Sequence, residues 1–178
     1  MTNRQQWTLV AGVVMTAVFG VALAIKLRPQ LNLLEVGSTA PDFQAVELSS
    51  GRPATIENYR GKVVLLNIWA TWCPPCKIEM PSMERLHQKL AGTDFQLVAV
   101  SVDEEDSSVV NKFVKEYGLT FPVLHNQDGS IRQIYQTTGV PESFVIDRDG
   151  VIVKKVIGAA DWDAPVNENL IRRLLDAR

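Results

Sequence analysis

The chain has 178 residues, enough for one domain of ordinary size plus an appendage, with a core that needs no covalent staple. The formal net charge is −2 and both signs are spread along the sequence, so the basic stripe typical of nucleic-acid binding is absent and that class is excluded. Two cysteines occur, Cys73 and Cys76, too close together to stabilise a fold as a disulfide and too few for a structural zinc site.

The N-terminal part of the chain contains an uncharged apolar segment. Residues 1–6 form a short flank, and residues 7–25 carry no charged side chain, close to the roughly 20 apolar residues that cross a bilayer. We expect a transmembrane anchor here, and the small-x-small pattern at 22–24 leaves a cleaved signal peptide open. Basic residues lie on both sides, so the positive-inside rule does not decide the orientation. Residues 26–36 are interpreted as a linker, and residues 37–178 as one domain.

Two nearly continuous apolar runs predict the centre of a sheet. Residues 62–69 and 95–102 are rich in β-branched side chains, which is typical of strands covered on both faces. Between them, apolar residues recur on one helical face: Met80, Met83, Leu86 and Leu90. The pattern predicts two parallel strands joined by a crossover helix that begins at the cysteines.

A second helix is expected after residue 106. Its predicted apolar face comprises Val109, Val110, Phe113, Val114 and Tyr117. Asp106 or Ser107 is placed to cap the start of this helix, and Gly118 to end it. The acidic run 103–106 suits the positive end of the helix dipole, so we expect a structural role for it.

Three further strands and a last helix follow. Residues 121–124, 143–147 and 151–157 have strand character, and a tight turn at 148–150 predicts that the last two form an antiparallel hairpin. The final helix, expected to be capped near Asp163, has one apolar face: Val166, Leu170, Ile171, Leu174 and Leu175. The order of elements indicates the α/β class, with a mixed central sheet and helices on both faces.

The sequence Trp72-Cys73-Pro74-Pro75-Cys76 stands where the first predicted strand gives way to the crossover helix, a context that favours a redox pair over inert core thiols. A helix N-terminus stabilises a thiolate, so we expect Cys73 to be the nucleophile. Cys76, one turn further in, is the expected resolving thiol that attacks the mixed disulfide. Pro74 and Pro75 restrict the chain here, which should shift the reduction potential.

Two segments carry a family resemblance. Residues 65–81, LLNIWATWCPPCKIEMP, and residues 138–150, TGVPESFVIDRDG, resemble the TlpA, ResA and CcmG (DsbE) group of membrane-anchored thiol-disulfide oxidoreductases. The cysteine motif and the proline motif occur in the order and at a separation that suit this group. The resemblance extends over residues 37–178, including APDF at 40–43, and implies a thioredoxin-like fold for that domain.

The same resemblance implies a substrate-binding surface. A cis peptide bond is expected between Val140 and Pro141, facing the disulfide, where the backbone of Val140 can meet an incoming strand; a trans proline that opens the next strand is the alternative. Glu142 would then lie near the substrate, unless it is a solvated loop charge. The expected substrate-binding residues are Trp72, Pro74, Pro75, Val140, Pro141 and Glu142.

A proton acceptor for the resolving thiol is also implied. Thioredoxins place a buried aspartate six residues before the first cysteine, where this chain has Asn67, which cannot accept a proton. In ResA-like proteins a glutamate three residues after the second cysteine is implicated, and Glu79 stands there. We expect Glu79 to couple proton movement to Cys76; the alternative is a carboxylate on the helix surface.

The resemblance implies an extracytoplasmic enzyme that exchanges disulfides with other proteins as a reductant, for example of apocytochrome c. It implies a single-pass protein of the bacterial cytoplasmic membrane, with its catalytic domain on the periplasmic side and a membrane thiol donor that re-reduces it. No cofactor or metal is expected beyond the disulfide. The alternatives are a peroxide reductase, which expects threonine where Ala70 stands, and a copper-binding chaperone using the cysteines with His87 or His125.

Overall fold

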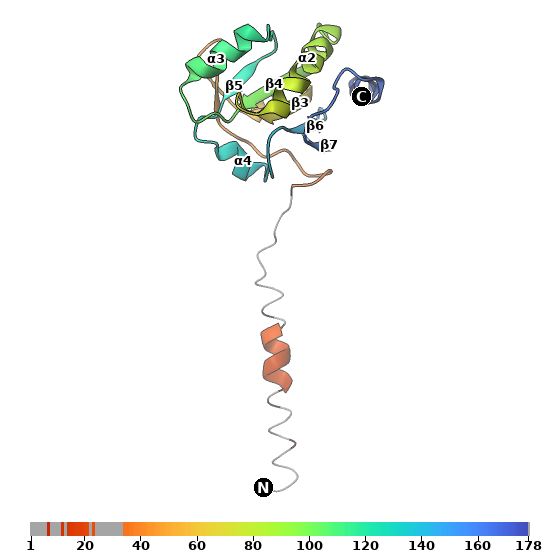
Figure 1. The fold of residues 1–178 in the computed structure, drawn as a ribbon. Helices are drawn as coiled ribbons and strands as arrows, with labels where there is room; N and C mark the ends of the chain where they lie inside the picture. The colour runs from red at the N-terminus through yellow and green to blue at the C-terminus, as the bar shows by residue number, and fades with distance from the viewer. Residues whose placement is uncertain (1–6, 8–11, 13, 22, 24–33, 178) are drawn as a thin grey trace. The chain divides into compact units, whose positions relative to one another are not determined.

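The computed structural model describes most of the chain (Figure 1). The described residues are 7, 12, 14–21, 23 and 34–177. The chain divides into two units, residues 1–33 and residues 34–178, and the second unit contains the whole described sheet.

The described residues of the first unit are helical. The transmembrane anchor predicted for 7–25 and the linker predicted for 26–36 fall partly outside the described residues, and both stay predictions. No helix built from the described residues has both the length and the apolar character needed to span a bilayer.

Seven strands in the described part of the chain form one mixed sheet in the order β2-β1-β5-β4-β3-β6-β7. Strand β3 pairs in parallel with β4, which pairs in parallel with β5, whereas β6 runs antiparallel to both β3 and β7. The predicted mixed sheet is therefore confirmed. The strand bounds are Ala45–Glu47 (β1), Pro53–Ala54 (β2), Val63–Trp69 (β3), Phe95–Ser101 (β4), Val123–His125 (β5), Glu142–Ile146 (β6) and Ile152–Ile157 (β7).

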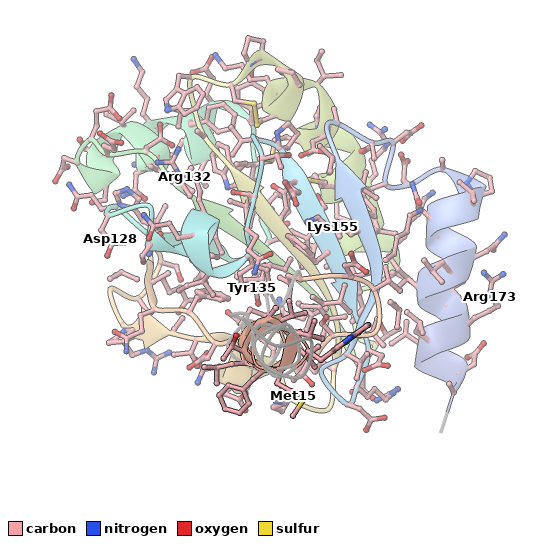
Figure 2. All side chains as sticks on the ribbon, turned by 90° about the horizontal axis from the view of Figure 1, so that it is seen from below. Met15, Asp128, Arg132, Tyr135, Lys155 and Arg173 are labelled. Atoms are coloured by element: carbon pink, nitrogen blue, oxygen red, sulfur yellow. A yellow bond between two sulfur atoms is a disulfide. The ribbon has the colours of Figure 1, made fainter. Side chains whose placement is uncertain are left out.

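Helices cover both faces of this sheet. Asn67 of β3 and Ser143 of β6 stand opposite each other, and Asn67 donates a hydrogen bond to Glu79 of helix α2. The next residue of β6, Phe144, points to the other face, where its ring centroid lies 5.0 Å from that of Tyr135 at the end of α4. Tyr135 is labelled in Figure 2. The helices are η1 (Ile56–Tyr59, 3-10), α2 (Pro74–Lys89), α3 (Ser107–Glu116), α4 (Ser130–Ile134) and α5 (Pro165–Asp176).

The centre of the fold agrees with the sequence prediction. All residues of β3 are buried, as expected for an apolar strand covered on both faces. The crossover helix α2 begins at the cysteines and buries its predicted apolar face: Met80, Met83, Leu86 and Leu90. The predicted β6–β7 hairpin is also confirmed. Its turn is held by Asp147 Oδ1, which accepts hydrogen bonds from the N–H groups of Asp149 and Val151, and Gly150 supplies the positive φ of 81°.

Several short elements were not predicted. Strands β1 and β2, helix η1 and helix α4 each have five residues or fewer, and so give no periodic pattern long enough to recognise. Strand β5 begins at Val123, two residues later than expected, because Phe121 and Pro122 lie in the approach to the strand.

Details of two helices differ from the prediction. Val109 of α3 is 41% exposed and Val166 of α5 is 70% exposed, although both were assigned to buried faces; each lies at the edge of an apolar stripe narrower than predicted. Asp106 caps α3 as predicted, by accepting a hydrogen bond from the N–H of Ser108. Helix α5 begins next to the position predicted near Asp163, but its N-cap is Ala164, which makes no side-chain cap, and Asp163 is instead paired with Arg85 of α2.

The adjacent residues Val109 and Val110 make a matched test of this packing. Val110 is fully buried, so Val110→Ala should lower the free energy of unfolding by about 2 kcal/mol through lost burial and a residual cavity. Val109→Ala should change it by less than about 0.5 kcal/mol, since an exposed valine loses little and alanine favours helix. Urea denaturation followed by circular dichroism measures both, and equal losses would show that the stripe is placed wrongly.

Candidate active site

Cys73 and Cys76 are joined in a disulfide at the start of α2, with Cα atoms 5.3 Å apart. Cys73 is the N-cap residue, and Pro74 and Pro75 occupy the first helical positions, where no donor N–H is needed. Cys73 Sγ accepts a hydrogen bond from the backbone N–H of Cys76 at 3.2 Å. An N–H directed at Cys73 Sγ, together with the helix dipole, favours negative charge on this sulfur when the disulfide is reduced.

The disulfide is largely covered by neighbouring groups. Cys73 is 2% exposed and Cys76 is fully buried, so Cys73 is less accessible than its expected role suggests. The residues around it lie on the surface: Trp72 is 57% exposed, and Pro74 and Pro75 are also exposed. These three predicted substrate-binding residues thus form an open, largely apolar rim beside Cys73.

A proline turn lies against the disulfide. The peptide bond between Val140 and Pro141 is cis, which confirms the expected isomer. The carbonyl oxygen of Val140 lies 3.4 Å from Cys73 Sγ, while Val140 is partly exposed and Pro141 is buried. Two segments more than sixty residues apart in sequence are therefore in contact at the sulfur, because β3 and β6 are antiparallel neighbours and the end of β3 meets the start of β6.

Glu79 lies in α2, one helical turn after Cys76, and is only 1% exposed. This excludes the surface-carboxylate alternative. Its Oε1 accepts a hydrogen bond from Asn67 Nδ2 at 2.8 Å, and its Oε2 accepts from the N–H of Ala160 at 3.2 Å and from Trp162 Nε1 at 3.4 Å. Burial raises the pKa of Glu79 from 4.5 to about 7, although the hydrogen bonds favour the carboxylate. The group can therefore gain or lose a proton near neutral pH.

The segment between β7 and α5, residues 158–164, closes over Glu79. Trp162 is fully buried; its backbone N–H donates to Ser82 Oγ, and that hydroxyl donates to the carbonyl oxygen of Glu79. Neither Trp162 nor Ser143 was predicted from the sequence. The hydroxyl of Ser143, on β6, accepts a hydrogen bond from Asn67 Nδ2, the same amide that donates to Glu79. No spacing pattern connects either residue with the cysteines, since tertiary contact alone brings them there.

Glu142 does not lie on the substrate-facing surface that was expected for it. It is fully buried and points to the sheet face opposite Ser143, so the solvated-loop alternative is excluded. One carboxylate oxygen pairs with Lys155 Nζ at 2.9 Å, and the other accepts a hydrogen bond from the N–H of Thr138 at 3.1 Å. Lys155 is labelled in Figure 2 on β7. The carboxylate thus supports the turn that leads to Pro141, and is not exposed for contact with a client.

In the described part of the chain, no group of three or more histidine, cysteine or acidic side chains lies close enough together to hold a metal ion. Both histidines are otherwise engaged. The ring of His87 packs edge-on against Phe121, and His125 Nε2 lies 2.8 Å from the carbonyl oxygen of Asp103.

Solved structures with the same architecture include thiol-disulfide enzymes. A thiol:disulfide interchange protein of the thioredoxin family from Chlorobium tepidum superposes with a TM-score of 0.66 and 28% identity, covering 79% of this chain and 98% of that one. StoA from Bacillus subtilis superposes with a TM-score of 0.61 and 26% identity, covering 76% and 96%. The expected thioredoxin-like α/β fold is thereby confirmed for the domain that carries the disulfide.

Sequence comparisons give the same assignment. Residues 36–155 match the AhpC/TSA family. The thiol-disulfide oxidoreductase ResA of Bacillus cereus is 34% identical over 156 residues, covering 88% of this chain and 89% of its own length. ResA of Bacillus thuringiensis subsp. konkukian is 39% identical over 125 residues, covering 70% and 71%. The chain therefore belongs to the AhpC/TSA family and, within its thioredoxin-like members, is a thiol-disulfide oxidoreductase of the ResA group.

Proposed function

We propose that this enzyme reduces disulfides of other proteins outside the cytoplasm, with Cys73 as the nucleophile and Cys76 as the resolving thiol. The observation that carries the proposal is the Cys73–Cys76 disulfide at the N-terminus of α2, with the Val140 carbonyl on one side and the buried Glu79 behind it. This arrangement supplies a stabilised thiolate, a backbone edge for a client strand and a proton acceptor.

The exchange proceeds in two steps with balanced electrons. The Cys73 thiolate attacks one sulfur of the client disulfide, forms a mixed disulfide and expels the other client sulfur as a thiolate. The Cys76 thiol then loses its proton and attacks Cys73 Sγ. This closes the intramolecular disulfide and releases the second client sulfur, so the client gains the two electrons that the enzyme loses.

Glu79 takes part in the second step by accepting the proton of Cys76. A carboxyl group with a pKa of about 7 divides its population between the charged and neutral forms near neutral pH, which suits a group that must both accept and return a proton. The position one turn after Cys76 in α2 places both side chains on the same helix face.

Client binding involves the rim around Cys73. Trp72, Pro74 and Pro75 offer exposed apolar surface, and Val140, preceding the cis-proline Pro141, offers its backbone to an extended client segment. Glu142 contributes indirectly, through its hydrogen bond to the turn that holds these two residues.

The proposed client, location and electron donor are those that the family resemblance implies. The enzyme acts on apocytochrome c, whose haem-attachment cysteines must be reduced before ligation, and a membrane thiol donor returns the electrons. Residues 7–25 anchor the chain in the bacterial cytoplasmic membrane as a single-pass protein with the catalytic domain in the periplasm. The names of the ResA relatives support the thiol-disulfide exchange reaction, and the uncharged apolar character of residues 7–25 supports the anchor.

The division of roles between the two cysteines can be tested by trapping. Cys76→Ser should accumulate a mixed disulfide between Cys73 and a cysteine-containing peptide, because the resolving thiol is missing. Cys73→Ser should form none. Non-reducing electrophoresis and mass spectrometry of the adduct provide the measurement, and adduct formation by the second variant alone would reverse the assignment.

The direction of electron flow can be tested through the reduction potential. Equilibration of the enzyme with a thiol buffer of defined potential should give a value near or below about −250 mV, comparable with the roughly −270 mV of thioredoxin. A value close to about −120 mV would identify a disulfide donor and contradict the proposed reductant.

The proton role of Glu79 predicts a change in pH dependence. The rate at which the reduced enzyme reduces a small disulfide should show an inflection near pH 7, and Glu79→Gln should lose it and be slowed above pH 7 by about 100-fold. Glu84→Gln, which changes another largely buried carboxylate of the same helix, is the matched control and should keep the inflection. An unchanged profile in the Glu79 variant would remove the role.

Stability gives an independent readout of the same group. The pKa of Glu79 is raised on folding, so proton binding by this group stabilises the folded protein. This stabilisation is fully present below pH 4.5 and is lost as the pH rises through about 7. Relative to Glu79→Gln, the oxidised wild-type protein should therefore lose up to about 3 kcal/mol of unfolding free energy across this interval. Urea denaturation at pH 4.5 and pH 8 measures the difference.

A further inference from the structure

A further buried carboxylate, Asp103, lies at the active-site edge of the sheet and takes no part in the steps above. Asp103 follows the end of β4 and is fully buried. It forms no ion pair with any residue in the range 34–177. A carboxylate without a cationic partner is costly to bury unless hydrogen-bond donors satisfy its oxygens.

The donors to Asp103 come mainly from the active-site turn. Thr71 Oγ1 donates to Oδ1 at 2.5 Å, and the backbone N–H of Thr71 is shared between Oδ2 at 3.0 Å and Oδ1 at 3.2 Å. Ser101 Oγ donates to Oδ2 at 2.6 Å. Hydrogen bonds to an ionised acceptor are about twice as strong as those between neutral groups, so the turn is firmly attached to the end of β4.

The backbone of Asp103 is held in place by residues of β4 and β5. The carbonyl oxygen of Asp103 lies 2.8 Å from Nε2 of His125 in β5, and the N–H of Asp103 donates to Ser101 Oγ at 3.1 Å. Asp103 is thus fixed at its backbone and presents its side chain to Thr71, two residues before Cys73.

The remaining contacts of the turn do not by themselves fix Thr71. The N–H of Val102 donates to the carbonyl oxygen of Trp69, which joins the ends of β4 and β3, and the N–H of Cys73 donates to Ala70 within the turn at 3.3 Å. Trp72, between Thr71 and Cys73, is mostly exposed and adds little packing.

We propose that Asp103 is a positioning residue for Cys73, acting through Thr71, and that this pair sets the direction from which the Cys73 thiolate attacks a disulfide. The inference rests on the proposed role of Cys73 as nucleophile. In the exchange the thiolate approaches one sulfur of the target as the other sulfur leaves with the electron pair of the broken bond, so the rate depends on alignment of the attacking atom.

The chain contains a matched pair elsewhere that has the same chemistry and no proximity to the disulfide. Glu84, in the C-terminal half of α2, accepts hydrogen bonds from the N–H of Thr120 at 2.8 Å and from Thr120 Oγ1 at 2.5 Å. Removal of the Thr71 hydroxyl takes one hydrogen bond from a carboxylate at the active-site turn. Removal of the Thr120 hydroxyl takes an equivalent bond from a carboxylate away from that turn.

The experiment compares four variants of the full chain in their reduced form: Thr71→Val, Thr71→Ser, Asp103→Asn and Thr120→Val. The probe is bis(2-hydroxyethyl) disulfide, chosen because it is uncharged and therefore insensitive to the charge removed in Asp103→Asn. Stopped-flow tryptophan fluorescence gives the second-order rate constant at fixed pH, and thermal unfolding of the oxidised forms gives the cost in stability.

Thr71→Val and Asp103→Asn should lower the rate constant by about tenfold. Thr71→Ser, which keeps the hydroxyl, should stay within about twofold of the wild type. Thr120→Val should lower the thermal midpoint as Thr71→Val does and leave the rate constant unchanged. If Asp103→Asn does not fold, the comparison of valine with serine at position 71 decides the question, because both leave the carboxylate intact.

Two results would overturn the inference: an unaltered rate constant in Thr71→Val, or an equal loss in Thr120→Val. Cys73→Ser separates this failure from that of the proposed function. An inert Cys73→Ser with an unaffected Thr71→Val removes only the role of Asp103. A Cys73→Ser variant that reacts as fast as the wild type removes the nucleophile assignment and the inference together.

Discussion

Strand β3 determines where the chemistry can occur, because its two neighbours bring three chain segments to the same edge of the sheet. The parallel partner β4 ends at that edge with Asp103 following it, and the antiparallel partner β6 starts there directly after Pro141. The cysteines follow the end of β3 itself. One strand, fully buried and hydrogen-bonded on both sides, thus aligns the disulfide, the proline turn and a buried carboxylate.

The site is unusual in how much charge it keeps out of water. Glu79, Asp103 and Glu142 are all essentially inaccessible, yet they are satisfied in different ways. Glu142 has a lysine partner. Asp103 accepts hydrogen bonds at 2.5–3.2 Å from two hydroxyl groups and a backbone N–H, and Glu79 accepts them at 2.8–3.4 Å from an amide, a backbone N–H and an indole. Burial raises the pKa of Glu79 to about 7. A carboxyl group with that pKa is suited to exchange a proton near neutral pH.

Some side chains of the site are buried and others are exposed to solvent. Cys76 and Glu79 are buried in α2, and Ala160 and Trp162 contact the Glu79 carboxyl, whereas Trp72 and the two prolines face solvent. Such a division suits exchange with folded or extended clients, because the resolving chemistry is shielded from water while the surface that meets the client stays accessible.

The sequence by itself determined the redox pair, the central strands, the crossover helix and the hairpin, because each depends on local spacing: two thiols at a helix start, continuous apolar runs, a 3.6-residue stripe and a tight turn. Glu79 was also selected, but through the family resemblance, which places a glutamate three residues after the second cysteine. The burial of Glu142, the cover provided by Trp162 and the attachment of Thr71 to Asp103 were decided only by tertiary structure. Each of those contacts joins residues from separate elements, and their partners are set by strand order and register, for which a single chain carries no local signal.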